Sequence, residues 1–197
     1  MNAYLMESNV IDFSHPEIVT LAATLADGNG SVEETAKNCF VWVRDNIRHS
    51  WDFRQNPVTW KASDVLQFRT GYCYAKSHLL AALLRANDIP AGFCYQRLSI
   101  TGQGAPYCLH GLNAVFLPEH GWYRIDPRGN KEGVNAQFTP PLESLAFPTG
   151  ESLEADLPEI WPEPLELVVS VLQRYTDIHD VFDNLPDVEL LPVRVVA

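Results

Sequence analysis

The sequence lacks the marks of a membrane-spanning or secreted chain. Nowhere in its 197 residues does an apolar run approach the about 20 residues that a helix needs to cross a bilayer. Residues 1–16 contain no basic region followed by an apolar core, so we expect no secretory signal. The four cysteines form no Cys-x-x-Cys pair and no regular framework, and a chain of this length can fold without disulfides. We therefore expect free thiols, a cytoplasmic location and no membrane partner.

Basic residues are also scarce. Lysine and arginine total 14 against 25 aspartates and glutamates, which gives a formal net charge of −11. Such a chain repels phosphate backbones and has no basic stripe, so nucleic acid is not an expected partner. Most of the excess acid lies in residues 139–197. We interpret this acidic region as a solvated surface, with a docking face for a protein partner as the alternative.

The length favours one domain with an appendage. We assign residues 1–138 to a core. Residues 139–197 form an acidic, proline-rich extension with one helix, from about Leu165 to Thr176, which we expect to pack on that core.

Helical patterns come first along the chain. Apolar residues recur at helical spacing after Ser14, and Ser31 with Glu34 forms a capping box at the start of a second helix. Residues 73–87 are apolar almost all round, which is typical of a helix buried at the centre of a domain, and Pro90 ends it.

The pattern then changes to strands, predicted at Ala91–Ile100, Leu112–Leu117 and Gly121–Ile125 and separated by turns with glycine or proline. Helices followed by a sheet indicate an α+β fold rather than alternating βαβ units. We expect N-terminal helices and a central buried helix packed on an antiparallel β-sheet.

Cys73 is the first candidate for chemistry. It follows Gly71-Tyr72 and opens the central helix, where free backbone N–H groups and the helix dipole favour an anion such as a thiolate. The same N–H groups can hold the oxyanion of an attacked carbonyl. A buried cysteine without chemistry is the plainer interpretation of this position taken alone.

His110 and Asp126 strengthen the functional interpretation. A thiolate needs an imidazole partner, and the imidazole needs an acceptor that orients it. We place His110 at the start of the second strand and Asp126 at the end of the third. A four-residue loop between these strands would put the two side chains on opposite faces, so we predict a three- or five-residue loop or a bulge, with Gly121 in a left-handed conformation.

Three segments of the sequence resemble the transglutaminase-like superfamily, microbial type. Gly71–Lys76, followed by Leu79–Ala86 and Ile89–Ala91, is similar to its cysteine segment. His110-Gly111 is similar to its histidine segment, and Gly121–Pro127 to its aspartate segment. The segments occur in the family order and lie within about residues 63–130.

The resemblance implies a papain-like core in which Cys73 is the nucleophile, His110 the base and Asp126 the residue that orients His110. It implies a thiol enzyme that acts on a peptide or small amide through an acyl-enzyme, most simply a hydrolase. Amine transfer of the transglutaminase type and a non-catalytic binding module are the alternatives. We expect no cofactor and no metal, since the sequence has no acidic calcium loop and Cys94, Cys108 and His110 have poor spacing for zinc.

Other side chains are weaker candidates. Trp51, Gln55 and Trp60 are candidates for the cleft or for an oxyanion donor, with packing in an aromatic loop as the alternative. His49 is interpreted as a loop or core histidine. Cys108 is a cleft resident, a redox partner of Cys73 or a packing residue.

Overall fold

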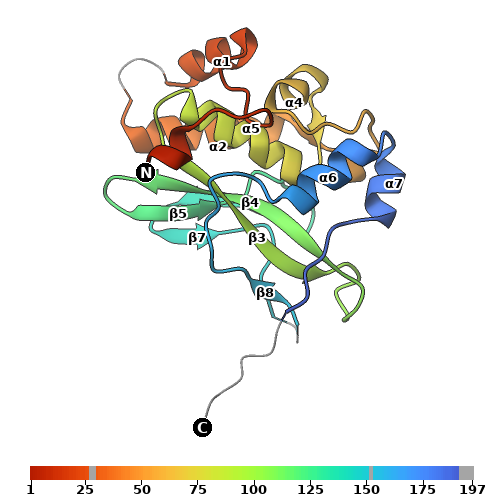
Figure 1. Cartoon of the computed structure of the whole chain (residues 1–197). Coiled ribbons are helices and arrows are strands. Elements are labelled where there is room, and N and C mark those ends of the chain that lie inside the picture. Colours follow the sequence, from red (N-terminus) through yellow and green to blue (C-terminus); the bar gives the residue numbers. More distant parts are fainter. Residues whose placement is uncertain (27–29, 151–152, 191–197) are drawn as a thin grey trace.

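A central helix packed on an antiparallel sheet organises the chain. The computed structural model describes residues 1–26, 30–150 and 153–190. Helices α1 (Pro16–Ala26), α2 (Val32–Asn46) and α4 (Ala62–Phe68) surround α5 (Cys73–Arg85), and all four lie on one side of the sheet (Figure 1). The predicted α+β arrangement is confirmed.

The main sheet has the strand order β5-β4-β3-β8. Its antiparallel strands are β3 (Ala91–Ser99), β4 (Tyr107–Leu117), β5 (Gly121–Ile125) and β8 (Ala155–Asp156). Short elements complete the described chain: a 3-10 helix at Asn2–Leu5, β1 (Arg48–His49) parallel to β2 (Thr70–Gly71), α3 (Ser50–Phe53), the hairpin β6 (Gln137–Thr139) with β7 (Leu142–Ser144), α6 (Glu166–Arg174) and α7 (Ile178–Asp183).

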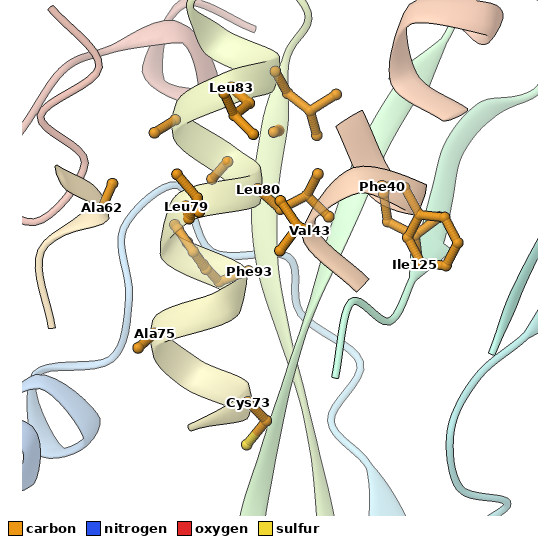
Figure 2. Packing of buried hydrophobic residues seen from close by; sticks show 14 of the residues in the cluster. Phe40, Val43, Ala62, Cys73, Ala75, Leu79, Leu80, Leu83, Phe93 and Ile125 are labelled. Carbon is orange, nitrogen blue, oxygen red and sulfur yellow. The ribbon is translucent and has the colours of Figure 1, made fainter. Parts of the chain in front are cut away.

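Every residue of α5 is buried, as its apolar composition predicts. Leu79, Leu80 and Leu83 are fully enclosed between the other helices and the sheet, and Cys73 lies at the helix end nearest the strands (Figure 2). Two buried cations on α5 are paired with backbone carbonyls, which offsets the cost of their burial. Lys76 donates to Ile47 O and Arg44 O, whereas Arg85 donates to carbonyls that include those of Ala91 and Met6.

The hairpin between β4 and β5 has a three-residue loop. Leu117 pairs with Gly121 and Phe116 with Trp122, so the loop consists of Pro118, Glu119 and His120. Gly121 has φ +71°, a left-handed conformation that glycine adopts without strain. Both predictions for this hairpin are confirmed, and the register directs His110 and Asp126 to the same face.

Strand β4 is longer than predicted. It begins at Tyr107 rather than Leu112, so His110 lies inside the strand and not at its start. Cross-strand pairs such as Leu98 with Cys108 and Gln96 with His110 extend the ladder. Cysteine, histidine and Gly111 give this stretch no clear alternation, which is why its sequence alone does not reveal a strand.

The described residues 139–150 and 153–190 contain two helices, α6 and α7, where one was predicted. Helix α7 has only six residues, too few for a periodic pattern, and is capped by the Asp177 side chain. Val168, Leu172, Ile178 and Val181 from these helices are buried in the same cluster as the leucines of α5. The division of the chain at residue 138 stays a prediction.

No helix in the described ranges combines the length and the apolar character that a membrane crossing requires.

Candidate active site

Cys73 is the first residue of α5, as predicted, and its side chain is largely buried. The preceding residue, Tyr72, makes no side-chain capping bond, because its hydroxyl donates to Ile178 O on α7 at 2.6 Å. The N–H groups of the first turn are therefore not capped by the side chain at the N-cap position, and they point where a negative charge is favoured.

His110 and Asp126 form a buried pair. His110 Nε2 donates to Asp126 Oδ2 at 2.7 Å, and Asp126 is fully enclosed. The carboxylate also accepts from the backbone N–H of Arg128 at 3.0 Å and of Ala146 at 3.1 Å. Burial raises the pKa of Asp126, but the His110 charge and these hydrogen bonds lower it more, so its net pKa lies below the ordinary 3.8.

Opposing effects act on His110. Burial lowers its pKa, whereas the charge of Asp126, the charge of Cys73 and hydrogen bonds to both residues raise it, and the net pKa is about 10. Since Nε2 is engaged with Asp126, the hydrogen bond with Cys73 falls to Nδ1. The structure thus brings Cys73, His110 and Asp126 together in the order that nucleophilic thiol chemistry requires.

A close contact between helix and strand sets this geometry. A Cβ atom at Gly111 would lie 2.8 Å from the Tyr74 ring and 3.3 Å from its Cα, so only glycine lets the first turn of α5 approach β4 this closely. Tyr74 also donates its hydroxyl to Leu109 O. The residues on both sides of His110 therefore hold the turn that carries Cys73.

Phe147 is a site residue that the sequence did not reveal. Its ring lies edge-on to His110, with centroids 5.1 Å apart, and its carbonyl accepts from Gln96 Nε2. Together with Ala146, it comes from the part of the chain beyond residue 138, where no motif marks a functional role.

Of the three candidates in the aromatic loop, only Trp51 lines the cavity at Cys73. Trp51 lines a cavity of about 440 Å³ that also contains Cys73 and His110. Trp60 and Gln55 are not among its lining residues. The Trp60 carbonyl instead pairs with His78 Nδ1, and Gln55 Oε1 is buried without a partner among the described residues.

His49 is buried, as interpreted, but it also lines the cavity. Burial lowers its pKa well below 6.5, the positive charge of Arg128 lowers it further and Asp52 raises it. Asp52 forms ion pairs with Arg128 and Lys131, each at 2.7 Å. Neither Asp52 nor Arg128 was singled out in the sequence, since ion pairs between distant segments leave no local pattern.

The other cysteines are free and buried to different extents. Cys108 lines the same cavity as Cys73, and burial, together with the charge of Cys73, raises its pKa to about 12. Cys94 packs in a small separate cluster with Leu112 and Ala114.

Replacing Asp126 by asparagine removes the largest contribution that raises the pKa of His110, while burial remains. The pKa of His110 is therefore expected to fall well below its wild-type value of about 10 in the Asp126→Asn variant. In the wild type, the raised His110 pKa stabilises the fold fully below pH 6.5 and this contribution is lost as the pH rises through about 10. NMR titration of the His110 ring measures the shift. Asp45→Asn, which removes an exposed ion pair, is the control. If the His110 ring titrates at the same pH in both variants, the pairing of His110 with Asp126 is contradicted.

Adding a methyl group at position 111 should separate α5 from β4. We expect Gly111→Ala to lower the free energy of unfolding by about 1–3 kcal/mol through overpacking and to slow alkylation of Cys73. Denaturant unfolding and peptide mass analysis measure the two effects. Gly150→Ala is the control, since no atom lies within 4 Å of the added Cβ. Equal behaviour of the two variants would contradict the role of the close contact.

Comparisons with known proteins place this chain in a family. No curated protein matches the chain. Among solved structures, a candidate cysteine protease from Cytophaga hutchinsonii aligns with TM-score 0.52 and 21% identity over 64% of this chain and 40% of its own. The periplasmic domain of TgpA from Pseudomonas aeruginosa aligns with TM-score 0.46 and 21% identity over 63% and 45%, and a TGase with TM-score 0.46 and 15% identity over 69% and 37%. The model of the transglutaminase-like superfamily matches residues 19–127. The chain belongs to the transglutaminase-like superfamily.

Proposed function

We propose that the protein is a thiol-dependent acyl-transfer enzyme that acts on an amide or peptide bond, with hydrolysis as its reaction. The observation that carries this proposal is the burial of His110 between Asp126 and Cys73, with Cys73 on the first turn of α5. Cys73, at the start of a helix, and His110, inside β4, line one cavity, and Asp126, just after β5, is enclosed and paired with His110.

The proposed reaction begins with attack of Cys73 Sγ on the substrate carbonyl carbon. The thiol proton resides on His110 as an imidazolium, which Asp126 stabilises. The C–S bond forms, the carbonyl electrons move to oxygen, and the N–H groups at the start of α5 stabilise this oxyanion. His110 then gives its proton to the leaving amine as the C–N bond breaks, which leaves a thioester on Cys73.

Water completes the reaction in the second half. His110, now neutral, takes a proton from water as the water oxygen attacks the thioester, and Cys73 leaves as a thiolate. The products are a carboxylic acid and the regenerated ion pair. An amine in place of water gives an amide product by the same steps, so hydrolysis and transfer differ only in the acceptor that reaches the thioester.

Location and partners belong to the same proposal. The four cysteines are free, which supports a reducing, cytoplasmic compartment. The substrate is a peptide or a small amide. Some acidic residues beyond 139 pair within the protein, such as Glu143 with Arg124 and Asp187 with Arg97, and the remaining acidic surface of this region is the proposed docking face for a protein partner.

Alkylation by iodoacetamide tests the nucleophile. At pH 6 we expect Cys73 to react on the order of 100-fold faster than Cys39, because a thiolate is the reactive form and burial raises the pKa of Cys39 to about 12. His110→Ala should abolish the difference, whereas His120→Ala, in the hairpin loop, should not. The rate at each cysteine is read by peptide mass analysis. If Cys73 reacts no faster than Cys39, the proposal is wrong.

A chromogenic acyl ester tests the acyl-enzyme and its acceptor. We expect a burst of released phenol equal to the enzyme concentration and an added acyl mass on Cys73, both absent in Cys73→Ala. With hydroxylamine present, the ratio of hydroxamate to acid measures transfer against hydrolysis. Predominant hydroxamate at low amine concentration would favour transfer, and a missing acyl mass in the active protein would exclude the covalent route.

A further inference from the structure

The cavity beside Cys73 has an aromatic wall that two distant segments build. Trp51 on α3 and Phe182 on α7 stack face to face, with ring centroids 3.6 Å apart and an angle of 1° between the planes. Both rings line the cavity. Tyr72 stands next to them and is fixed to α7 through its bond to Ile178 O.

Other segments add apolar residues to the lining of the cavity. Leu98 and Ile100 line it from the end of β3 and the residue that follows, and Phe147 lines it from the segment that supports His110. Leu185, just after α7, also lines it. Apolar side chains from four separate parts of the chain thus converge on one space in front of the thiol.

Charged groups at the cavity already have partners within the protein. Arg128 is paired with Asp52. The carboxylate of Glu154 accepts from the backbone N–H of Ser99 at 2.9 Å and of Gly150 at 3.2 Å. These charges are therefore paired within the protein. Arg128 Nη1 and His49 Nδ1 make no hydrogen bond among the described residues, but most of the cavity surface is apolar, so apolar contact is the main interaction that it offers to a ligand.

We propose that this cavity binds a large apolar side chain on the acyl side of the scissile bond, aromatic or branched, and that Phe182 is a specificity-determining residue. The inference rests on the proposed function and deepens it by naming the substrate class. The cavity volume of about 440 Å³ is many times the space that one water molecule needs. A large apolar side chain that enters the cavity therefore displaces water from its apolar walls. A pocket of this kind discriminates one methylene by about 10- to 200-fold.

Two chloromethyl ketones test the proposal, one built on N-acetylphenylalanine and one on N-acetylglycine. In each, Cys73 Sγ displaces chloride and forms a C–S bond. Rates at Cys73 are normalised to those with free cysteine. We expect the phenylalanine reagent to react at least about 10-fold faster than the glycine reagent.

Variants test which residues cause the preference for the phenylalanine reagent. Phe182→Ala should lower the rate ratio several-fold, and Ile100→Glu, which puts a charge at the cavity without removing core packing, should lower it as well. Phe53→Ala is the matched control, since Phe53 is exposed and is not among the cavity-lining residues. Unfolding curves confirm that each variant is folded.

Alkylation by iodoacetamide, measured in parallel, distinguishes failure of the proposed substrate class from failure of the proposed function. If Cys73 reacts rapidly with iodoacetamide but the two ketones react equally, the substrate class is wrong and the proposed function stands. If Cys73 is inert to all three reagents, the proposed function itself is wrong. If the phenylalanine reagent reacts faster but neither Phe182→Ala nor Ile100→Glu lowers the rate ratio, the assignment of the preference to this cavity is wrong. If only Ile100→Glu lowers the rate ratio, the proposed role of Phe182 is wrong.

Discussion

The contact between the first turn of α5 and Gly111 of β4 is the constraint on which the site depends. A Cβ atom at position 111 would lie 2.8 Å from the ring of Tyr74 and 3.3 Å from its Cα, and the Tyr74 hydroxyl donates to Leu109 O. Because His110 lies between these two positions, the strand that carries the imidazole and the helix that carries the thiol are fixed relative to each other. Packed interiors tolerate small displacements poorly, so this contact sets the separation of the reacting groups.

Asp126 and His110 keep their charges through pairing and hydrogen bonds, which outweigh the opposing effect of burial. Asp126 is enclosed and accepts hydrogen bonds from His110, Arg128 and Ala146, and an enclosed carboxylate without such partners would be protonated. The imidazolium of His110 persists because this anion lies beside it, even though burial alone would remove its proton. Interactions that stabilise the fold near neutral pH are thus the ones that prepare the site for chemistry.

Local patterns in the sequence predicted the main helices and three strands of the sheet, and they drew attention to Cys73, His110 and Asp126, which the structure brings together. The all-round apolar stretch marked α5, the capping box marked α2, and the face argument for His110 and Asp126 led to the observed three-residue loop. What the sequence did not reveal arises from contacts between distant segments. Phe147 reaches His110, and Asp52 pairs with Arg128, only after the chain has folded, and no local periodicity or motif encodes such contacts.

The hydrogen bond from Tyr72 to Ile178 has a consequence for the timing of synthesis. It joins the residue before Cys73 to a helix that lies more than one hundred positions later in the chain. The stacked pair at Trp51 likewise forms only when Phe182 is present. A ribosome that has made the motif residues 71–127 has therefore not yet made the residues that close the cavity. We expect the thiol to remain without its finished pocket until α7 has emerged, so that catalytic competence is among the last properties the growing polypeptide acquires.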